Sequence, residues 1–508
     1  MRFINSIKNF AVGIGGNILT IVLGFFSRYF FLLLLSVEYL GVSGLFSSIL
    51  TMLSFAELGV GTAIIYSLYK PLAVKDNETV LSIMQFFKKV YRTIGCIVFV
   101  IGLCFLPFLD FFVTDRKGIE NLELIYVLFL LNTAISYFFT YNRSLITADQ
   151  KAYKLAAIDY LYKIGHVVIP LLVLWATRSY IIYLAIQITT TFLWNFIVYI
   201  KVQKEYPILQ DRKKHRISGR VKKEITKNTT ALMIYKIAIV VTAGTDNLLI
   251  TRFFGLTTVG LCSNYTLIIQ NMTSLVSQGI SSITASIGNL SAVENDEKKY
   301  QIFNIVFLVN FWIYAFASLG LFFCMNPLIH VCFGERYVLG NSILVPMIVS
   351  FFLLGMQGTT SVFREAQGLF WQGKLRPIAQ ALINLGSSVI FTKLTGEVGM
   401  IFWGTAISRI VTNFWYDPYI VFKHGLHKPL FPYFRRYIIY VAAIIPPLVI
   451  CHLLYRMILV DSHLLDLLLK TVITTVVVNL CLFLSLSRTK EFKYLRSNLY
   501  RALKSRNK

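Results

Sequence analysis

Long apolar stretches, separated by short polar segments, follow one another along the whole chain. Many run for roughly 18 or more residues, the length that a helix needs to cross the hydrocarbon core of a bilayer. Barrel-type segments of ~10 residues with alternating polarity do not stand out. The pattern predicts an all-α integral membrane protein with about 14 transmembrane helices. The expected spans are 10–35, 41–68, 93–113, 123–146, 156–175, 180–200, 229–253, 259–287, 303–325, 342–362, 377–394, 398–421, 437–459 and 464–486.

Composition supports this class. Of 508 residues, 56% are hydrophobic and 14% charged, and the mean hydropathy is +0.66, whereas a soluble domain carries about 25% charged residues. The first apolar stretch continues to about Ser36 without a clean cleavage site, so we interpret it as an uncleaved span. The seven cysteines show no paired spacing, so neither a metal site nor a disulfide framework is expected.

The positive charge is concentrated beside the apolar spans. The net charge is +25, and the densest basic stretches are 201–227 and the tail after Ser487. If both termini are cytoplasmic, the inner segments collect about 37 of the 49 Lys and Arg residues and the outer loops about five. This asymmetry predicts that orientation, with basic segments near anionic lipid headgroups. No nucleic-acid partner is expected.

A weak internal repeat organises the spans. Leu40–Glu78 aligns without gaps on Val259–Glu297, and "YNRSLITADQKAYK" and "VFREAQGLFWQGKL" each follow the fourth span of a set of six. We therefore expect two six-helix lobes related as parallel repeats, with two additional C-terminal helices. The predicted boundaries are an N-terminal lobe at 1–200, a basic cytoplasmic linker at 201–228, a C-terminal lobe at 229–422, the last two helices at 437–486 and a basic cytoplasmic tail at 487–508.

Five basic residues lie deep inside predicted spans: Arg28, Lys163, Lys236, Arg252 and Arg409. Each costs about 2.5–3.5 kcal/mol at mid-membrane unless it is paired or lines a wet cavity. An excess of buried cations suits an anionic substrate, in particular phosphate, which arginine binds through two parallel hydrogen bonds. The alternative for Arg28 and Arg252 is that they anchor helix ends at the outer interface.

Three acids in the same spans offset part of this charge: Glu57, Asp159 and Asp246. Asp159 and Lys163 are four residues apart on one helical face, so a local ion pair between them is expected. The remaining acids are expected to neutralise cations of neighbouring helices. Three acids against five bases still leave a cationic excess.

No constellation typical of an enzyme is present. The sequence has neither a G-x-x-x-x-G-K-[ST] phosphate loop nor an H-E-x-x-H metal pair, and its seven histidines lack ligand spacing. The predicted outer loops are short and leave no room for a catalytic domain. The sequence therefore predicts a protein that is not an enzyme and that holds no cofactor or metal.

Three stretches carry a resemblance to a known family. "EYLGVSGLFSSILTMLSFAELGVGTAIIYSLYKPLAVKDNE" (Glu38–Glu78), "GTDNLLITRFFGLTTVGLCSNY" (Gly244–Tyr265) and "FGERYVLG" (Phe333–Gly340) resemble the Wzx-type polysaccharide repeat-unit flippases. These form the polysaccharide-transport branch of the multidrug/oligosaccharidyl-lipid/polysaccharide (MOP) exporter superfamily. The resemblance extends over essentially the whole chain.

The resemblance implies a flippase of the bacterial cytoplasmic membrane. Its substrate would be an undecaprenyl-diphosphate-linked oligosaccharide, moved to the outer leaflet by alternating access through a cationic inter-lobe cavity, for O-antigen, capsule or exopolysaccharide synthesis. The five intramembrane cations would hold the diphosphate or the sugar. Glu57, Asp246 and Asp159 would balance charge or carry a coupling H⁺ or Na⁺. Membrane lipids, a polysaccharide polymerase and a chain-length regulator are the expected partners.

Three alternatives stay open. A drug antiporter of the same superfamily would need an acidic cavity, and the count here is basic. A membrane polysaccharide polymerase or lipid-linked glycosyltransferase would be expected to carry a sizeable external loop. The third is a lipid II flippase from a sister branch, which the quoted motifs disfavour only moderately.

Overall fold

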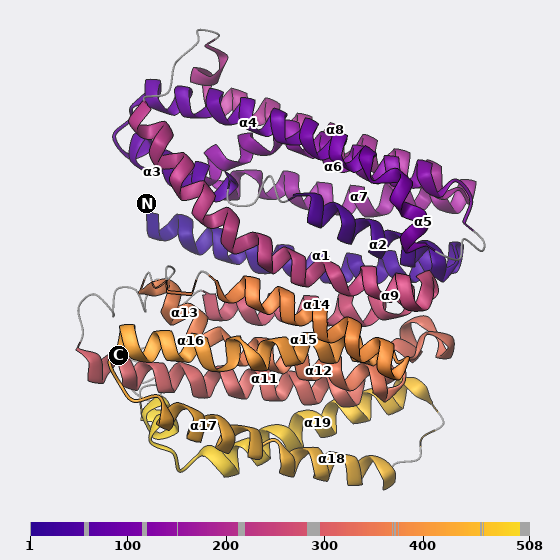
Figure 1. The fold of residues 1–508 in the computed structure, drawn as a ribbon, viewed down its shortest axis with the longest axis vertical. Helices are drawn as coiled ribbons and strands as arrows, with labels where there is room; N and C mark the ends of the chain where they lie inside the picture. Colours follow the sequence, from indigo (N-terminus) through magenta and orange to yellow (C-terminus); the bar gives the residue numbers. More distant parts are fainter. Residues whose placement is uncertain are drawn as a thin grey trace. The chain divides into compact units, whose positions relative to one another are not determined.

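The computed structural model consists of helices and connecting turns throughout its described residues (Figure 1). These are 2–54, 60–113, 119–149, 151–211, 219–281, 295–367, 369, 372–373, 375–457, 460 and 462–497. Seven helices in this part of the chain are long and apolar enough to cross a membrane, or eight if one bent pair is a single span. Within the described residues, all fourteen predicted spans fall largely on helices. The predicted fold class, an all-α multi-pass membrane protein, is confirmed.

The chain divides into two compact units, Met1–Ser263 and Asn264–Lys508, each described by itself. The predicted lobe boundaries stay a prediction. The helices of the first unit are α1 (Arg2–Leu34), α2 (Val37–Leu53), α3 (Val60–Ala73), α4 (Asn77–Cys104), α5 (Leu109–Phe112), α6 (Leu122–Ala148), α7 (Ala156–Thr177), α8 (Tyr180–Glu205) and the start of α9 (Gly219–Ser281).

Helix α6 is the centre of the first unit, since it packs against α2, α3, α4 and α8. Its Tyr126 is fully buried and meets the ring of Phe46 on α2 edge to face, with centroids 5.1 Å apart. Helix α4 begins where the Asp76 side chain accepts a hydrogen bond of 3.0 Å from the backbone N–H of Thr79, which satisfies an N–H group that the helix start leaves unpaired. Helices α4 and α8 both lie beside α6, against which they pack (Figure 1).

Helix α9 contains a sharp break at Gly255, whose φ of 83° and ψ of 172° interrupt an otherwise helical run. Glycine adopts such positive φ values without steric cost. The break falls between two of the predicted spans, 229–253 and 259–287. In the repeat alignment Gly255 corresponds to Ser36, one of the two residues between α1 and α2. In the repeat, the part of α9 before Gly255 thus corresponds to α1, and the part after it corresponds to α2.

The second unit contains α11 (Asp296–Phe333), α12 (Asn341–Met356), α13 (Gly358–Ala366), α14 (Arg376–Thr395), α15 (Gly399–Val411), α16 (Asn413–Val421), α17 (Phe431–Ala442), α18 (Ile445–Met457) and α19 (His463–Leu486). Aromatic rings hold α17 on α11. Phe307 and Phe311 are four residues apart on one face of α11 and stack on Tyr433 and Tyr440, with centroids 5.0 and 4.6 Å apart. All four rings are buried, so this stripe is a core contact of the unit.

Candidate functional site

In the described part of the first unit, α2 and α9 approach each other closely at two glycines. A Cβ atom added to Gly41 would lie 2.0 Å from the carbonyl oxygen of Leu256, and one added to Gly260 would lie 2.4 Å from that of Val37. Both distances are below van der Waals contact, so only glycine fits at either position. Small residues are the usual means by which membrane helices approach this closely.

This contact is reciprocal. The alignment of Leu40 on Val259 shifts the chain by 219 positions, and the same shift relates Gly41 to Gly260 and Val37 to Leu256. Each glycine therefore faces the partner of the other, as at an interface with two-fold symmetry. The sequence repeat and the helix contact thus agree residue by residue at this place.

A second pair of contacts follows the same relation. Arg28 on α1 donates a hydrogen bond of 2.8 Å to the hydroxyl of Ser263, and Asn247 on α9 donates one of 3.4 Å to the carbonyl of Gly44. The 219-position shift converts the first pair into the second. The two equivalent positions differ in charge, since one is arginine and the other asparagine. A half-buried cation therefore lies on only one side of the contact.

Two of the predicted cations lie along α1. The Lys163 ammonium, from α7, donates hydrogen bonds of 2.9 Å to the carbonyl of Gly16 and to the hydroxyl of Thr20. Arg28 is eight residues beyond Thr20, a rise of about 12 Å along the helix. The structure therefore places the Lys163 ammonium and the Arg28 guanidinium about two turns apart along α1, each with polar partners.

The expected ion pair between Asp159 and Lys163 is wrong. Asp159 pairs with Arg143 of α6, with 2.7 Å between guanidinium nitrogen and carboxylate oxygen, whereas Lys163 contacts α1. The two residues are neighbours on α7, but their side chains reach different helices. Asp159 thus balances Arg143, which is not one of the five predicted intramembrane cations.

Arg252 lies in a different environment. Its side chain is exposed, and its guanidinium stands over the ring of Phe111 on α5, 5.0 Å from the centroid. Phe111 is itself exposed and belongs to the segment that connects α4 to α6. This position agrees with the alternative interpretation of Arg252 as an anchor at the end of a helix.

The other predicted residues of the first unit are described only in part. Glu57 lies outside the described residues, and so does the side chain of Lys236, although its backbone belongs to α9. Asp246 is half-buried on α9, one residue before Asn247. Their predicted roles stay predictions.

Arg409 belongs to the second unit. It lies half-buried on α15, and its guanidinium donates a hydrogen bond to the backbone carbonyl of Ser350 on α12. This hydrogen bond orients the guanidinium toward α12. The predicted role of Arg409 in binding an anion is compatible with this arrangement and stays a prediction.

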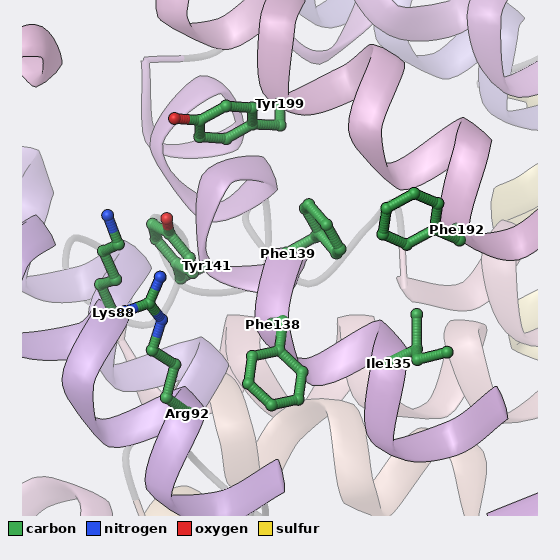
Figure 2. A pocket seen from close by; sticks show the side chains of 8 residues that line it. All are labelled: Lys88, Arg92, Ile135, Phe138, Phe139, Tyr141, Phe192 and Tyr199. Carbon is green, nitrogen blue, oxygen red and sulfur yellow. The ribbon is translucent and has the colours of Figure 1, made fainter. Parts of the chain in front are cut away.

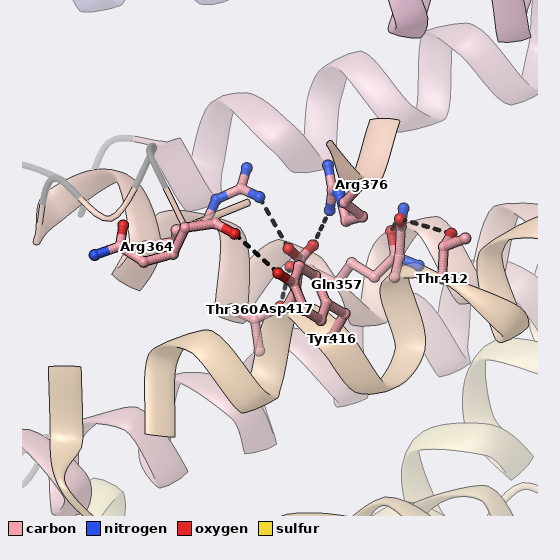
Figure 3. Close-up of polar contacts among 9 residues, drawn as sticks. Gln357, Thr360, Arg364, Arg376, Thr412, Tyr416 and Asp417 are labelled. Carbon is pink, nitrogen blue, oxygen red and sulfur yellow. Dashed lines mark hydrogen bonds and ion pairs between the residues drawn. The ribbon is translucent and has the colours of Figure 1, made fainter. Parts of the chain in front are cut away.

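A buried acid outside the set of predicted site residues, Asp417, lies at the centre of a cluster of polar contacts in the second unit (Figure 3). Asp417 on α16 is fully buried, and its two carboxylate oxygens pair with Arg364 of α13 and Arg376 of α14. The Arg364 contact measures 2.9 Å. Both arginines are buried as well, so this cluster fixes three helices to one another. Asp417 falls inside the predicted span 398–421, and an acid at such a position indicates an intramembrane charge that needs a partner.

Comparison with known proteins defines the class of fold. No family model and no curated protein matches the sequence. Among solved structures, the lipid II flippase MurJ in an inward closed conformation is similar with a TM-score of 0.66 at 15% identity, over 95% of this chain and 98% of MurJ. An inward-facing multidrug resistance MATE family transporter of the MOP superfamily has a TM-score of 0.63 at 14% identity, over 79% of this chain and 94% of its own.

A further similar structure is a MOP superfamily transporter from Pyrococcus furiosus, described by a reversed polarity of its binding pocket, with a TM-score of 0.53 at 15% identity over 84% and 96% of the two chains. The protein therefore has the fold of MOP-superfamily transporters. Among these structures, MurJ matches it over nearly the full length of both chains.

Proposed function

We propose that this protein is a flippase that moves an undecaprenyl-diphosphate-linked oligosaccharide from the inner to the outer leaflet of a bacterial cytoplasmic membrane. The observation that carries the proposal is the MOP-transporter fold, combined with the half-buried Arg28 at the contact of α1 with α9. A transporter fold with intramembrane cations suits a lipid whose transported end carries a diphosphate.

The charge balance supports an anionic substrate. Asp417 is a further acid within the spans, but two buried arginines already share its carboxylate. Asp159 likewise pairs with Arg143, which was not among the five cations. Neither acid therefore offsets Arg28 or Lys163, whose described hydrogen bonds go to uncharged groups.

In this proposal Arg28, Lys163, Lys236, Arg252 and Arg409 bind the diphosphate or the sugar. Arg28 has the main role and Arg252 a minor one, because Arg252 is exposed beside Phe111. Glu57 and Asp246 adjust the charge or carry a coupling H⁺ or Na⁺. A polysaccharide polymerase and a chain-length regulator are the proposed partners, since such proteins would act on the lipid-linked oligosaccharide in the outer leaflet.

Alternating access requires a helix contact that closes the cavity on one side of the membrane and that opens when the other side closes. The reciprocal packing of Gly41 and Gly260 between α2 and α9 has the properties of such a closure, because it is close, small and uncharged. We propose that it opens when the substrate leaves toward the outer leaflet.

The proposal is tested by deleting the gene in its own host and measuring lipid-linked oligosaccharide and surface polysaccharide. Loss of the polymer, with intact single units accumulating on the inner leaflet and rescue by the wild-type gene, is the expected result. Units that reach the outer leaflet and stay unpolymerised would instead indicate a polymerase. Accumulation of lipid II, with normal surface polysaccharide, would indicate a lipid II flippase.

A further inference from the structure

A pocket of about 390 Å³ lies within the first unit, between α4, α6 and α8 (Figure 2). Its volume is within the range of small-ligand sites. None of the predicted cavity residues contributes to it. Eight side chains line the pocket: Lys88, Arg92, Ile135, Phe138, Phe139, Tyr141, Phe192 and Tyr199.

One end of the pocket is cationic. Lys88 and Arg92 are four residues apart on α4, so both project from the same face of the helix. Figure 2 shows their nitrogen atoms on the same side of the pocket as the hydroxyl of Tyr141. In the part of the chain that the structure describes, no acidic side chain forms an ion pair with either cation. Two like charges are thus held together at a site that can accept an anion.

The other end is apolar and aromatic. The ring of Phe139 meets that of Phe192 edge to face at 5.7 Å and that of Tyr199 at 6.4 Å between centroids. Phe138 and Phe192 are more than one-third exposed in the described chain. These rings therefore form a wall that extends from the cationic end to the surface of the unit.

The lining of the pocket changes from polar to apolar along the helix axes. On α8 the tyrosine at 199 lies seven residues beyond Phe192, a rise of about 10 Å. On α6 Tyr141 likewise follows Phe138, and Lys88 and Arg92 lie in the first two-thirds of the antiparallel α4. All polar groups of the pocket thus lie toward the end that the charge pattern predicts to be cytoplasmic, and the apolar groups lie toward mid-membrane.

We propose that this pocket binds a phosphate-bearing lipid, with the phosphate between Lys88 and Arg92 and the hydrocarbon chain along Phe138 and Phe192. Arginine and lysine are the usual phosphate ligands, and basic pockets between membrane helices on the cytoplasmic side bind anionic headgroups. A soluble phosphate has no hydrocarbon group that could pack against the aromatic wall. The site is separate from the proposed transport cavity, and it does not depend on the proposed function.

The test measures the midpoint of thermal unfolding of the purified full-length protein in detergent, titrated with four probes. These are dioctanoyl phosphatidylglycerol, dioctanoyl phosphatidylcholine, farnesyl diphosphate and inorganic phosphate. A ligand that binds the folded state raises the midpoint in a saturable manner. The variants are R92Q and K88Q, with K89Q as the matched control. Lys89 is exposed on the same helix and does not line the pocket.

We expect saturable stabilisation by an anionic lipid, and the tighter of the two anionic lipids identifies whether the headgroup is that of a phospholipid or an isoprenoid diphosphate. Loss of one charged hydrogen bond is expected to raise the half-saturating concentration about tenfold in R92Q and in K88Q, with no change in K89Q. Arg92 is exposed, so R92Q is expected to fold. Equal stabilisation by phosphatidylcholine, stabilisation by inorganic phosphate alone, or equal behaviour of R92Q and K89Q would overturn the proposal.

Discussion

The hydroxyl of Thr257 donates a hydrogen bond of 2.9 Å to the carboxylate of Glu38, and the two residues are 219 positions apart in the chain. The same interval aligns Leu40 with Val259 in the internal repeat. The two residues are therefore equivalent positions that meet each other, as happens beside a two-fold axis. The reciprocal glycine contacts lie one turn away on the same helices, so α2 and α9 meet through a symmetric interface.

Substituting a glycine of this interface should destabilise the protein. The Cβ atom of Gly41→Ala would lie 2.0 Å from a backbone oxygen, which cannot rotate away. We expect a loss of about 1–3 kcal/mol, typical of overpacking, and a lower midpoint of thermal unfolding in detergent. Gly386→Ala on α14 is the matched control, since no atom lies within 4 Å of its added Cβ. An unchanged midpoint in Gly41→Ala would contradict the described contact.

Arg28 and Arg252 should differ in their effect on transport. Arg28 is half-buried with a polar partner on α9, whereas Arg252 is exposed beside a phenylalanine. We expect Arg28→Ala to lower the initial rate of flipping by at least about tenfold, as for loss of one charged hydrogen bond to the substrate, and Arg252→Ala to change it little. The measurement is the rate in proteoliposomes with equal amounts of folded protein. Equal losses in both variants would mean that Arg252 also binds the substrate.

The spans could be predicted from the sequence because apolar length alone determines them. The turn at Gly255 was also predictable, because it separates two apolar stretches in the repeat alignment. Partners across helices were not predictable: Asp159 has Lys163 within one turn of its own helix, yet it pairs with Arg143. Sequence spacing identifies neighbours on one helix, whereas the packing of different helices decides which polar groups meet.

The same limit explains the missed sites. Asp417 binds arginines 53 and 41 positions away, and nothing in its own segment indicates them. Lys88 and Arg92 lie between the predicted spans 41–68 and 93–113, and the aromatic residues that complete their pocket come from two other helices. Residues that form a site jointly from three helices have no common pattern along the chain.

Removing the buried acid of the second unit should cost more stability than removing an exposed one. Asp417→Asn would leave two buried guanidinium groups without their shared carboxylate. Breaking a buried pair in this way costs about 3–5 kcal/mol. The control is Glu297→Gln, which breaks a pair with Lys428 in which the carboxylate is 75% exposed and for which about 0–1 kcal/mol is expected. Thermal unfolding of both variants in detergent provides the comparison, and equal losses would contradict the assigned burial.

The predicted orientation places both termini in the cytoplasm, because the basic tail after Ser487 follows an even number of predicted spans. A green fluorescent protein fused after Lys508 should fluoresce, and alkaline phosphatase at the same position should be inactive. Fusions after Arg178, in the turn between α7 and α8, should show the opposite pattern. Active phosphatase after Lys508 would contradict the orientation.

The central claim is best tested with the purified protein in liposomes that contain an undecaprenyl-diphosphate-linked oligosaccharide. A glycosidase that cannot cross the membrane is added outside, and the fraction of oligosaccharide that it cleaves is followed with time. The account predicts that wild-type protein exposes the inner pool and that the cleaved fraction rises well beyond the half present outside, whereas Arg28→Ala slows this rise. A fraction that stays at one-half with folded wild-type protein, under an H⁺ gradient, under a Na⁺ gradient and without either, would contradict the account.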